Sequence, residues 1–452
     1  MIDIGRLLKG ITEPVMGCTE PAALALASSL AVNLARGGVP ECCGLENKGA
    51  APFSFKKNSD GIESMTVRTS KNLFKNAMSV GIPNTDGQCG IELAAALGAY
   101  LDPSLGLGLL KGIDPEALAS AHTLIGAGRV DFEVDERDEQ IFIEARAIVL
   151  EDGQRHIGEV IVRGRHDGLS LLRLDGCKLL ENRVDAAAEV FGRDLEALSH
   201  MSIQQLIELS GTLSDDDVHM LLEGAALNLK ASERGLELGL GLGVGAALSN
   251  MREQGSLGKG IVSEARIMTA AACDARMSGD DVEIMASGGS GNQGIMIYIP
   301  ATMVAKEYDS GDRLLGEALA LGQLITAVMT HEAGLLGGMC GCVVKAGLGA
   351  AVAVARLLSD KPEVVEGAIN NMAANIIGEI CDGAKVGCAL KLSTAAGTAV
   401  ESALMSASGL SVPSSNGIVG RGALETLESI GKLARSMRQV DRRIVEIMSA
   451  KV

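Results

Sequence analysis

Aromatic residues are scarce in this sequence of 452 residues, which contains no Trp, three Tyr and six Phe. Single-stranded nucleic acids are usually held by bases stacked on aromatic side chains, and the chain offers no such platform. Basic residues are also outnumbered, because 40 Lys and Arg face 57 Asp and Glu and leave a formal net charge of −17. Nucleic acids and anionic membranes need a net basic surface. The composition therefore excludes a general nucleic-acid or membrane-surface binding protein.

Long uninterrupted apolar stretches are scarce as well. The apolar stretches 236–248 and 333–344 have 13 and 12 residues, short of the roughly 20 that span a bilayer, and we predict that both form buried helices. The N-terminus lacks a basic segment followed by an apolar run and a cleavage site. Ten cysteines are too few for a disulfide scaffold of this length. We therefore expect no membrane partner and a cytoplasmic location, where thiols stay reduced.

Five of the ten cysteines occur in three short stretches that are rich in glycine and poor in charge. These five are Cys18, Cys340, Cys342, Cys381 and Cys388. Glycine lets the backbone approach a bulky inorganic centre, and thiolates hold iron–sulfur clusters. The spacing matches neither a zinc ribbon nor the compact ferredoxin motif, so the pattern alone leaves two interpretations open. The cysteines either bind an iron–sulfur cluster or are inert thiols in tight helix packing.

The other five cysteines share no pattern, and we interpret them as packing residues. They are Cys42, Cys43, Cys89, Cys177 and Cys273.

The order of the sequence patterns predicts an α+β fold with two domains. Residues 21–36 and 89–100 have helical patterns, and the apolar–polar alternation typical of strands occurs at 62–69, 129–134, 140–150 and 158–163. From Met201 onward helical periodicity dominates, and the many glycines and alanines favour closely packed helices. We therefore predict an α+β domain over 1–190 and a larger all-helical domain over 191–452.

A polar glycine-rich loop, Ser287 to Gly294, lies between two apolar segments. Exposed backbone N–H groups next to neutral donors suit a carboxylate or a phosphate at the start of a helix. Ser287, Ser290 and Asn292 are the candidate binding side chains, although a plain flexible turn is the alternative. The loop is not a Walker motif, because it lacks the Gly-Lys-Ser/Thr ending.

Candidate acid–base groups are few. Lys385 and Lys391 flank Cys388 in an otherwise apolar stretch, where a lysine can act as a charge partner, can act as a base if burial lowers its pKa, or can simply extend to solvent. Of the six histidines, His166 and His331 are candidate general bases, because imidazole titrates near neutrality. The alternative for each is a structural role without any part in catalysis.

Several motifs occur in an order that resembles the L-cysteine desulfidase family, which is related to the alpha part of iron–sulfur L-serine dehydratases. The motifs, which run over nearly the whole chain, are Gly17-Cys18-Thr19-Glu20-Pro21, Lys75-Asn76 with Gly81-Ile82-Pro83, Ser287 to Gly294, Met339 to Cys342, and Ile380 to Lys391. The resemblance implies an oxygen-sensitive 4Fe-4S cluster held by three cysteines, with the fourth iron free for substrate.

Carried over by motif, the resemblance implies the cluster ligands Cys18, Cys381 and one of Cys340 and Cys342, with Cys340 preferred. The serine dehydratases take a ligand from a region that resembles Cys388 and none from a site like Cys18, so these two roles are exchangeable. The implied reaction is a β-elimination that turns L-cysteine into sulfide, ammonia and pyruvate. The Ser287 to Gly294 loop would hold the substrate carboxylate.

The sequence is compatible with three functions. The first is an L-cysteine desulfidase, the second an L-serine dehydratase that uses the same chemistry, and the third a non-catalytic sensor or metal-free relative. As catalytic residues we select His166, Lys385 and Lys391, with His166 preferred as the base that removes the α-proton. The expected partners are a small amino-acid substrate and no nucleic acid, and a homo-oligomer is left open.

Overall fold

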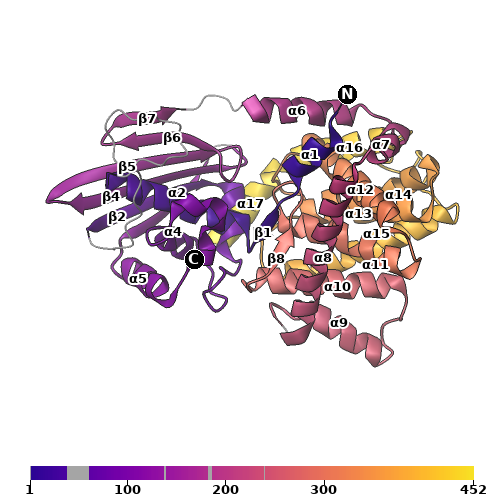
Figure 1. Cartoon of the computed structure of the whole chain (residues 1–452), viewed down its shortest axis with the longest axis horizontal. Helices are drawn as coiled ribbons and strands as arrows, with labels where there is room; N and C mark the ends of the chain where they lie inside the picture. Colours follow the sequence, from indigo (N-terminus) through magenta and orange to yellow (C-terminus); the bar gives the residue numbers. More distant parts are fainter. Residues whose placement is uncertain (1, 38–60, 137–138, 182–185, 239, 452) are drawn as a thin grey trace.

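The computed structural model describes residues 2–37, 61–136, 139–181, 186–238 and 240–451. It has two parts, an α+β part built around one large sheet and a larger body of helices (Figure 1). This arrangement confirms the predicted fold class. Cys42 and Cys43 lie outside the described residues.

The large sheet has the strand order β3-β2-β4-β5-β6-β7. Its strands are β2 (Ile62–Ser70), β3 (Val130–Asp135), β4 (Phe142–Glu151), β5 (Gln154–Arg163), β6 (Leu169–Leu174) and β7 (Cys177–Glu181). The pair β2·β3 is parallel, with Met65 opposite Val130, and the other pairs are antiparallel. The four predicted strands are confirmed, and β6 and β7 were missed.

Helix α2 (Thr19–Ala35) packs on β4 and β5 of this sheet and is buried along its whole length. It is buried on every side because α4 (Ile91–Gly98) covers its other face. A Cβ atom at Gly158 would collide with the backbone of α2 at Ala31, so the helix lies unusually close to β5. The start of this helix, next to Cys18, is thereby held in a fixed position.

The remaining helices of the α+β part lie around α2 and the sheet. They are α3 (Lys71–Met78), the 3-10 helix η2 (Pro103–Gly112) and α5 (Pro115–Gly126).

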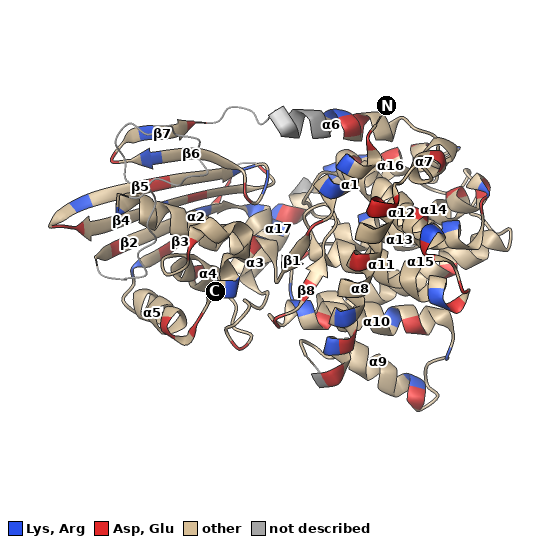
Figure 2. Ribbon diagram, viewed as in Figure 1, with Lys and Arg blue, Asp and Glu red and all other residues tan. Residues whose placement is uncertain are grey.

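The helical body packs around α13, whose neighbours are α11, α12, α14 and α15. Its helices are α6 (Ala186–Ser199), α7 (Ile203–Ser210), α8 (Asp215–Leu238), α9 (Val244–Glu253), α10 (Ile261–Met277), α11 (Gly291–Glu307), α12 (Asp312–Ala333), α13 (Gly341–Leu358), α14 (Pro362–Ile376), α15 (Cys388–Ala407) and α16 (Ala423–Ser436). In Figure 2, α2 and α13 carry few charged residues, as expected for helices at the centre of their parts.

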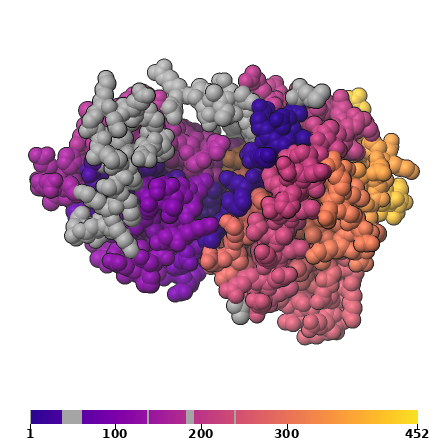
Figure 3. Space-filling model, viewed as in Figure 1, coloured from indigo at the N-terminus to yellow at the C-terminus, as the bar shows by residue number. Residues whose placement is uncertain are grey.

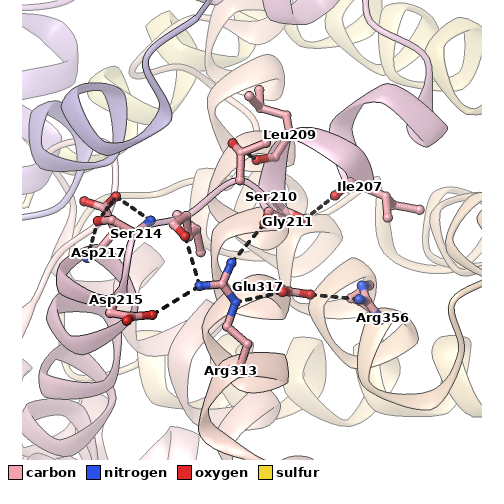
Figure 4. A network of polar contacts seen from close by, with 12 residues as sticks. Ile207, Leu209, Ser210, Gly211, Ser214, Asp215, Asp217, Arg313, Glu317 and Arg356 are labelled. Carbon is pink, nitrogen blue, oxygen red and sulfur yellow. Dashed lines mark hydrogen bonds and ion pairs between the residues drawn. The ribbon is translucent and has the colours of Figure 1, made fainter.

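A polar network ties three helices of this body together (Figure 4). The carboxylate of Glu317 accepts hydrogen bonds from Arg313 Nε at 3.0 Å and from Arg356 Nη2 at 2.9 Å. Arg313 also donates to the carbonyl oxygen of Leu213 at 2.9 Å and lies 3.7 Å from Asp215. The network therefore joins α12 and α13 to the start of α8, and none of its residues named here lines the pocket described below.

Both ends of the chain cross between the two parts. Helix α1 (Ile4–Ile11) packs into the core of the helical body, and β1 (Pro14–Met16) pairs with β8 (Glu283–Met285). In Figure 3 this N-terminal segment lies along the boundary between the two parts. At the other end, α17 (Arg438–Ser449) packs against α3, and Val445 joins the core under the sheet. The boundary at residue 190 stays a prediction, and hydrophobic packing does not follow it at either end.

The prediction that each of the two apolar stretches forms one buried helix is wrong, because neither stretch is a continuous helix. In 236–248, α8 ends at Leu238 and α9 begins at Val244, because glycines at positive φ, Gly241 and Gly243, turn the chain. In 333–344, α12 ends and α13 begins, with a glycine-rich loop between them.

Two described helices, α12 and α13, are long and apolar enough to cross a membrane by length and composition. However, 78% of each apolar window is buried inside the protein. Both are therefore explained as core helices of the helical body.

Candidate functional site: a thiol-lined pocket between the two parts

Five cysteines line one pocket at the junction of the two parts. They are Cys18, Cys340, Cys342, Cys381 and Cys388, the same five that share the glycine-rich pattern. The pocket also takes residues from α3 and from the loop after β5, so the sheet part and the helical body both contribute. The fold therefore gathers thiols that are separated by as many as 370 residues (388 − 18) in sequence.

The starts of four helices converge on this pocket. Cys18 precedes α2, Ser290 precedes α11, Cys340 precedes α13, and Cys388 is the first residue of α15. The N-terminus of a helix carries unpaired N–H groups and a partial positive charge, which stabilise anions nearby. Thiolates and a substrate carboxylate are both favoured by such a setting.

The thiols in the pocket differ in how readily they ionise. A hydrogen bond from Cys342 lowers the pKa of Cys340 to about 7, and the same bond raises the pKa of Cys342. Burial raises the pKa of Cys381, and it raises that of Cys388 to about 11. Burial also raises the pKa of Cys18, whose thiol donates to Glu20 Oε2 at 3.0 Å. Cys340 is thus the thiol that loses its proton most easily.

Two buried lysines that we did not select from the sequence stand beside these thiols. Lys345 lines the pocket, and its ammonium donates to the carbonyl oxygens of Gly334 at 3.1 Å and Leu335 at 2.9 Å. Burial lowers the pKa of Lys345 to about 8. Lys75 donates to the carbonyl oxygen of Cys381 at 3.1 Å. A cation near the thiols favours their ionised forms.

The two lysines that we did select are bound in an ion-pair cluster. Asp382 Oδ1 lies 2.5 Å from Lys385 Nζ and 2.9 Å from Lys391 Nζ. Lys391 lines the pocket, whereas Lys385 does not. Burial would lower the pKa of Lys391, but the bond to Asp382 outweighs burial and raises it. A proton held this tightly is hard to remove, which disfavours Lys391 as a base, and Lys385 does not reach the pocket lining.

His166 comes from the loop after β5, lines the pocket and is 6% exposed. Its Nε2 lies 3.9 Å from Glu20 Oε1 and has no hydrogen-bond partner among the described residues. His331, the other candidate, is exposed at the end of α12 and does not line the pocket. The structure therefore brings only the first of the two histidines to the thiols.

The loop Ser287 to Gly294 reaches the pocket with part of its length. Ser290 and Asn292 line it, and Ser290 Oγ lies 4.0 Å from Cys342 Sγ. Ser287 is buried instead and bonds to Gln323 at 2.5 Å, outside the lining. Asn292 Oδ1 accepts a hydrogen bond from Arg276 Nη1 at 3.0 Å, and this arginine was also missed by the sequence reasoning.

The missed residues had a weak signal in the sequence. Lys345 is a lone charge in an apolar stretch, and Arg276 lies in a mostly apolar stretch with one acidic neighbour, Asp274. A charge in such a stretch often has a function or a buried partner. Glu20 belongs to the Gly17 to Pro21 motif, but only its cysteine was selected.

The donor set of the pocket differs from that of a site for a single metal ion. Among the described residues, no three His, Cys, Asp or Glu side chains are arranged so as to hold a single metal ion. The ligands of a cluster bind different iron atoms and therefore lie farther apart than the ligands of one ion. Several thiols facing one pocket with cations beside them are the donor chemistry that a cluster requires, so the residues fit it.

The fold and the pocket define an α+β protein whose large helical body carries a thiol-lined pocket at its junction with a sheet. Residues 183–446 match the model of the family described as "Serine dehydratase alpha chain". The chain is 35% identical over 445 residues to a "UPF0597 protein" of Desulfatibacillum aliphaticivorans, with 97% of this chain and 96% of that one covered. It is 34% identical to UPF0597 proteins of Clostridioides difficile, with 98% of each chain covered, and of Alkaliphilus oremlandii, with 98% of this chain and 97% of that one covered. The protein belongs to the serine dehydratase alpha chain family and is a relative of the UPF0597 proteins.

Proposed function

We propose that the protein is a lyase that removes sulfide from L-cysteine by β-elimination. The observation that supports this proposal most is the meeting of five cysteines with His166, Glu20 and two buried cations, Lys345 and Arg276, in one pocket. A pocket of this kind offers metal ligands, a proton acceptor and charges of both signs. These are the groups that an elimination from an amino acid needs.

Cys18, Cys381 and one of Cys340 and Cys342 would hold a 4Fe-4S cluster. Cys340 is preferred within the pair because its thiol ionises more readily and thiolates are the form that binds iron. Cys388 remains the alternative ligand. When bound, the cluster supplies a Lewis-acidic iron with an open position, which makes a thiol or hydroxyl a better leaving group.

The chain's own residues would carry the proton and hold the substrate. The imidazole of His166 accepts the α-proton, the electrons of the broken C–H bond form the Cα–Cβ double bond, and the Cβ–S bond breaks so that sulfide leaves. The aminoacrylate that remains adds water and gives pyruvate and ammonia. Ser290, Asn292 and the N-terminus of α11 would bind the substrate carboxylate.

L-Serine dehydration is the second candidate function. The description of the matching family favours it, and the two reactions differ only in the leaving group. The arrangement of His166 and the thiols serves either substrate.

The test is an anaerobic assay of sulfide and pyruvate from L-cysteine and L-serine, with wild-type protein and two variants. Cys381→Ala removes a proposed ligand, and Cys89→Ala removes an exposed cysteine outside the pocket. We expect wild-type protein to produce pyruvate from at least one of the two amino acids. Cys381→Ala should lose this activity, and Cys89→Ala should keep it. Iron-loaded wild-type protein that turns over neither amino acid, or full activity of Cys381→Ala, would contradict the proposal.

A further inference from the structure

Arg276 is a buried cation with no anionic partner among the described residues. It lies near the end of α10, lines the pocket and is 2% exposed. Its Nη1 donates to the amide oxygen of Asn292, and its Nε has no hydrogen-bond partner among the described residues. No carboxylate of the described residues forms an ion pair with it. A guanidinium has five N–H donors, and burying one with a single neutral acceptor is unfavourable unless an anion completes the site.

The surroundings of Arg276 favour a carboxylate. Its guanidinium lies against Gly291, where a Cβ atom would collide with it, so glycine is required for this approach. Gly291 is the first residue of α11, whose N-terminus also attracts an anion. A planar guanidinium matches the two oxygens of a carboxylate. Two independent features therefore point to an anion at the same place.

The carboxylate of Glu20, in the same pocket, indicates that the ligand also carries a positive charge. Glu20 is 8% exposed and lines the same pocket. Its nearest described basic group is His166, at 3.9 Å. A pocket with an unpaired cation and a carboxylate complements a molecule that carries both an anion and a cation, as an α-amino acid does.

We propose that Arg276, supported by Asn292 and the N-terminus of α11, binds the α-carboxylate of the amino-acid substrate and thereby sets the enzyme's preference for α-amino acids over simple thiols and amines. The inference rests on the proposed function for the identity of the substrate. It adds a specificity-determining residue to the polar loop, whose own side chains are neutral.

The competing explanation is that Arg276 only compensates the charge of the thiols. Burial raises the pKa of Cys18, and the guanidinium opposes that rise. A counter-ion of this kind would be needed for iron binding and would not distinguish between ligands with and without a carboxylate. The experiment must therefore separate ligand binding from cluster retention.

The test measures, by calorimetry, the binding of three probes to the full chain purified without oxygen. L-Alanine has both charged groups and no leaving group, isopropylamine lacks the carboxylate, and propionate lacks the ammonium. We expect wild-type protein to bind L-alanine at least tenfold more tightly than either fragment. Arg276→Gln should lose at least tenfold in affinity for L-alanine and leave isopropylamine unchanged. Arg266→Gln is the matched control, because Arg266 lies on the same helix outside the pocket.

Arg276→Lys is the second variant, since it keeps the charge if the glutamine variant does not fold. It should bind L-alanine with an affinity between those of wild type and Arg276→Gln, with an unchanged melting temperature and iron content. Wild-type affinity for L-alanine in a folded Arg276→Gln would overturn the proposal. An Arg276→Gln variant that loses iron but binds L-alanine as tightly as wild type would also overturn it. Arg276-dependent L-alanine binding in a protein inactive on both amino acids would uphold this site while refuting the proposed reaction.

Discussion

At the scale of single residues, we propose His166, a buried side chain that lines the pocket, as the base of the reaction. Its Nε2 is buried and has no hydrogen-bond partner among the described residues. We predict that His166→Ala lowers kcat by about 10²–10⁴-fold, the usual loss for a general base, and leaves the absorption of the cluster unchanged. His156→Ala is the control, because that histidine pairs with Asp175 on the outer part of the sheet. Exchange of the substrate α-deuterium at the wild-type rate in His166→Ala would show that another group takes the proton.

Lys345 gives a prediction about pH. Burial lowers its pKa from the ordinary 10.5 to about 8, so the unfolded chain binds more protons than the folded chain between these values. The free energy of unfolding that this residue contributes is therefore lowest below about pH 8 and rises towards pH 10.5. We expect Lys345→Met in the cluster-free chain to raise the melting temperature at pH 7 by about 2–6 °C, and this gain to fade towards pH 10.5.

The control for this prediction is Lys306→Met, at an exposed position of α11. Calorimetry at several pH values measures both variants. A Lys345→Met variant that is less stable than wild type at pH 7 would show that the bonds from Lys345 to the carbonyls of Gly334 and Leu335 outweigh the penalty of burying its charge.

The sequence predicted some site residues well because their signal is local. Cysteines close to glycine in stretches with little charge form a pattern within a few residues, and all five of them line the pocket. The roles of Lys345 and Arg276 depend instead on helices that bury them from several sides. Ser287 lay in the right loop, but its hydrogen bond to Gln323 could not be read from its neighbours in sequence.

At the scale of elements, the loop that carries Cys381 depends on one close backbone contact. Gly383 has φ +92°, and a Cβ atom there would collide with the carbonyl oxygen of Lys75. Gly409 has a similar φ of +86° with nothing within 4 Å. We predict that Gly409→Ala costs only about 1–2 kcal/mol from the unfavourable φ, whereas Gly383→Ala costs more and also lowers the iron content.

Thermal unfolding and iron analysis of both glycine variants check this prediction. Equal stability and equal iron content would mean that the loop relaxes without moving Cys381.

Secondary structure was predictable where periodicity was strong. The strands β2 to β5 alternate between apolar and polar residues and were found. Strand β6 reads Leu-Ser-Leu-Leu-Arg-Leu over 169–174, which breaks the alternation, and the five residues of β7 are too short for a clear pattern. The prediction of helices over 236–248 and 333–344 failed for a different reason. It relied on apolar composition and gave too little weight to the glycines that turn the chain.

At the scale of the whole molecule, a buried ion pair fastens the C-terminal helix to the α+β part. Lys75 Nζ on α3 lies 2.5 Å from Asp441 Oδ1 on α17, and their side chains are 1% and 10% exposed. We predict that Asp441→Asn destabilises the protein by about 3–5 kcal/mol, because it leaves the ammonium of Lys75 buried and unpaired. Since Lys75 also bonds to the carbonyl oxygen of Cys381, the variant should lose iron more easily.

Denaturant unfolding and iron retention measure this effect. Glu428→Gln is the matched control, since Glu428 pairs with Lys432 at 2.7 Å with both side chains at least half exposed, and exposed pairs contribute only about 0–1 kcal/mol. An Asp441→Asn variant as stable as this control would rule out a fastening role.

The crossing of the chain ends is the feature of the whole molecule that the sequence did not reveal. Lys75 and Asp441 are 366 residues apart, and no local pattern links α17 to α3. Helix α1 likewise lies in the helical body although it precedes the sheet in sequence. Such contacts are decided by how complete surfaces fit together, which a single sequence does not record.

We propose that the pocket holds an iron–sulfur cluster that acts on an amino acid. The most direct test is the iron and acid-labile sulfide content of wild-type protein purified and reconstituted without oxygen, compared with Cys381→Ala treated in the same way. We predict about four iron and four sulfide per wild-type chain and a large loss of both in the variant. Wild-type protein that takes up no iron, or a variant that takes up as much as wild type, would contradict this proposal.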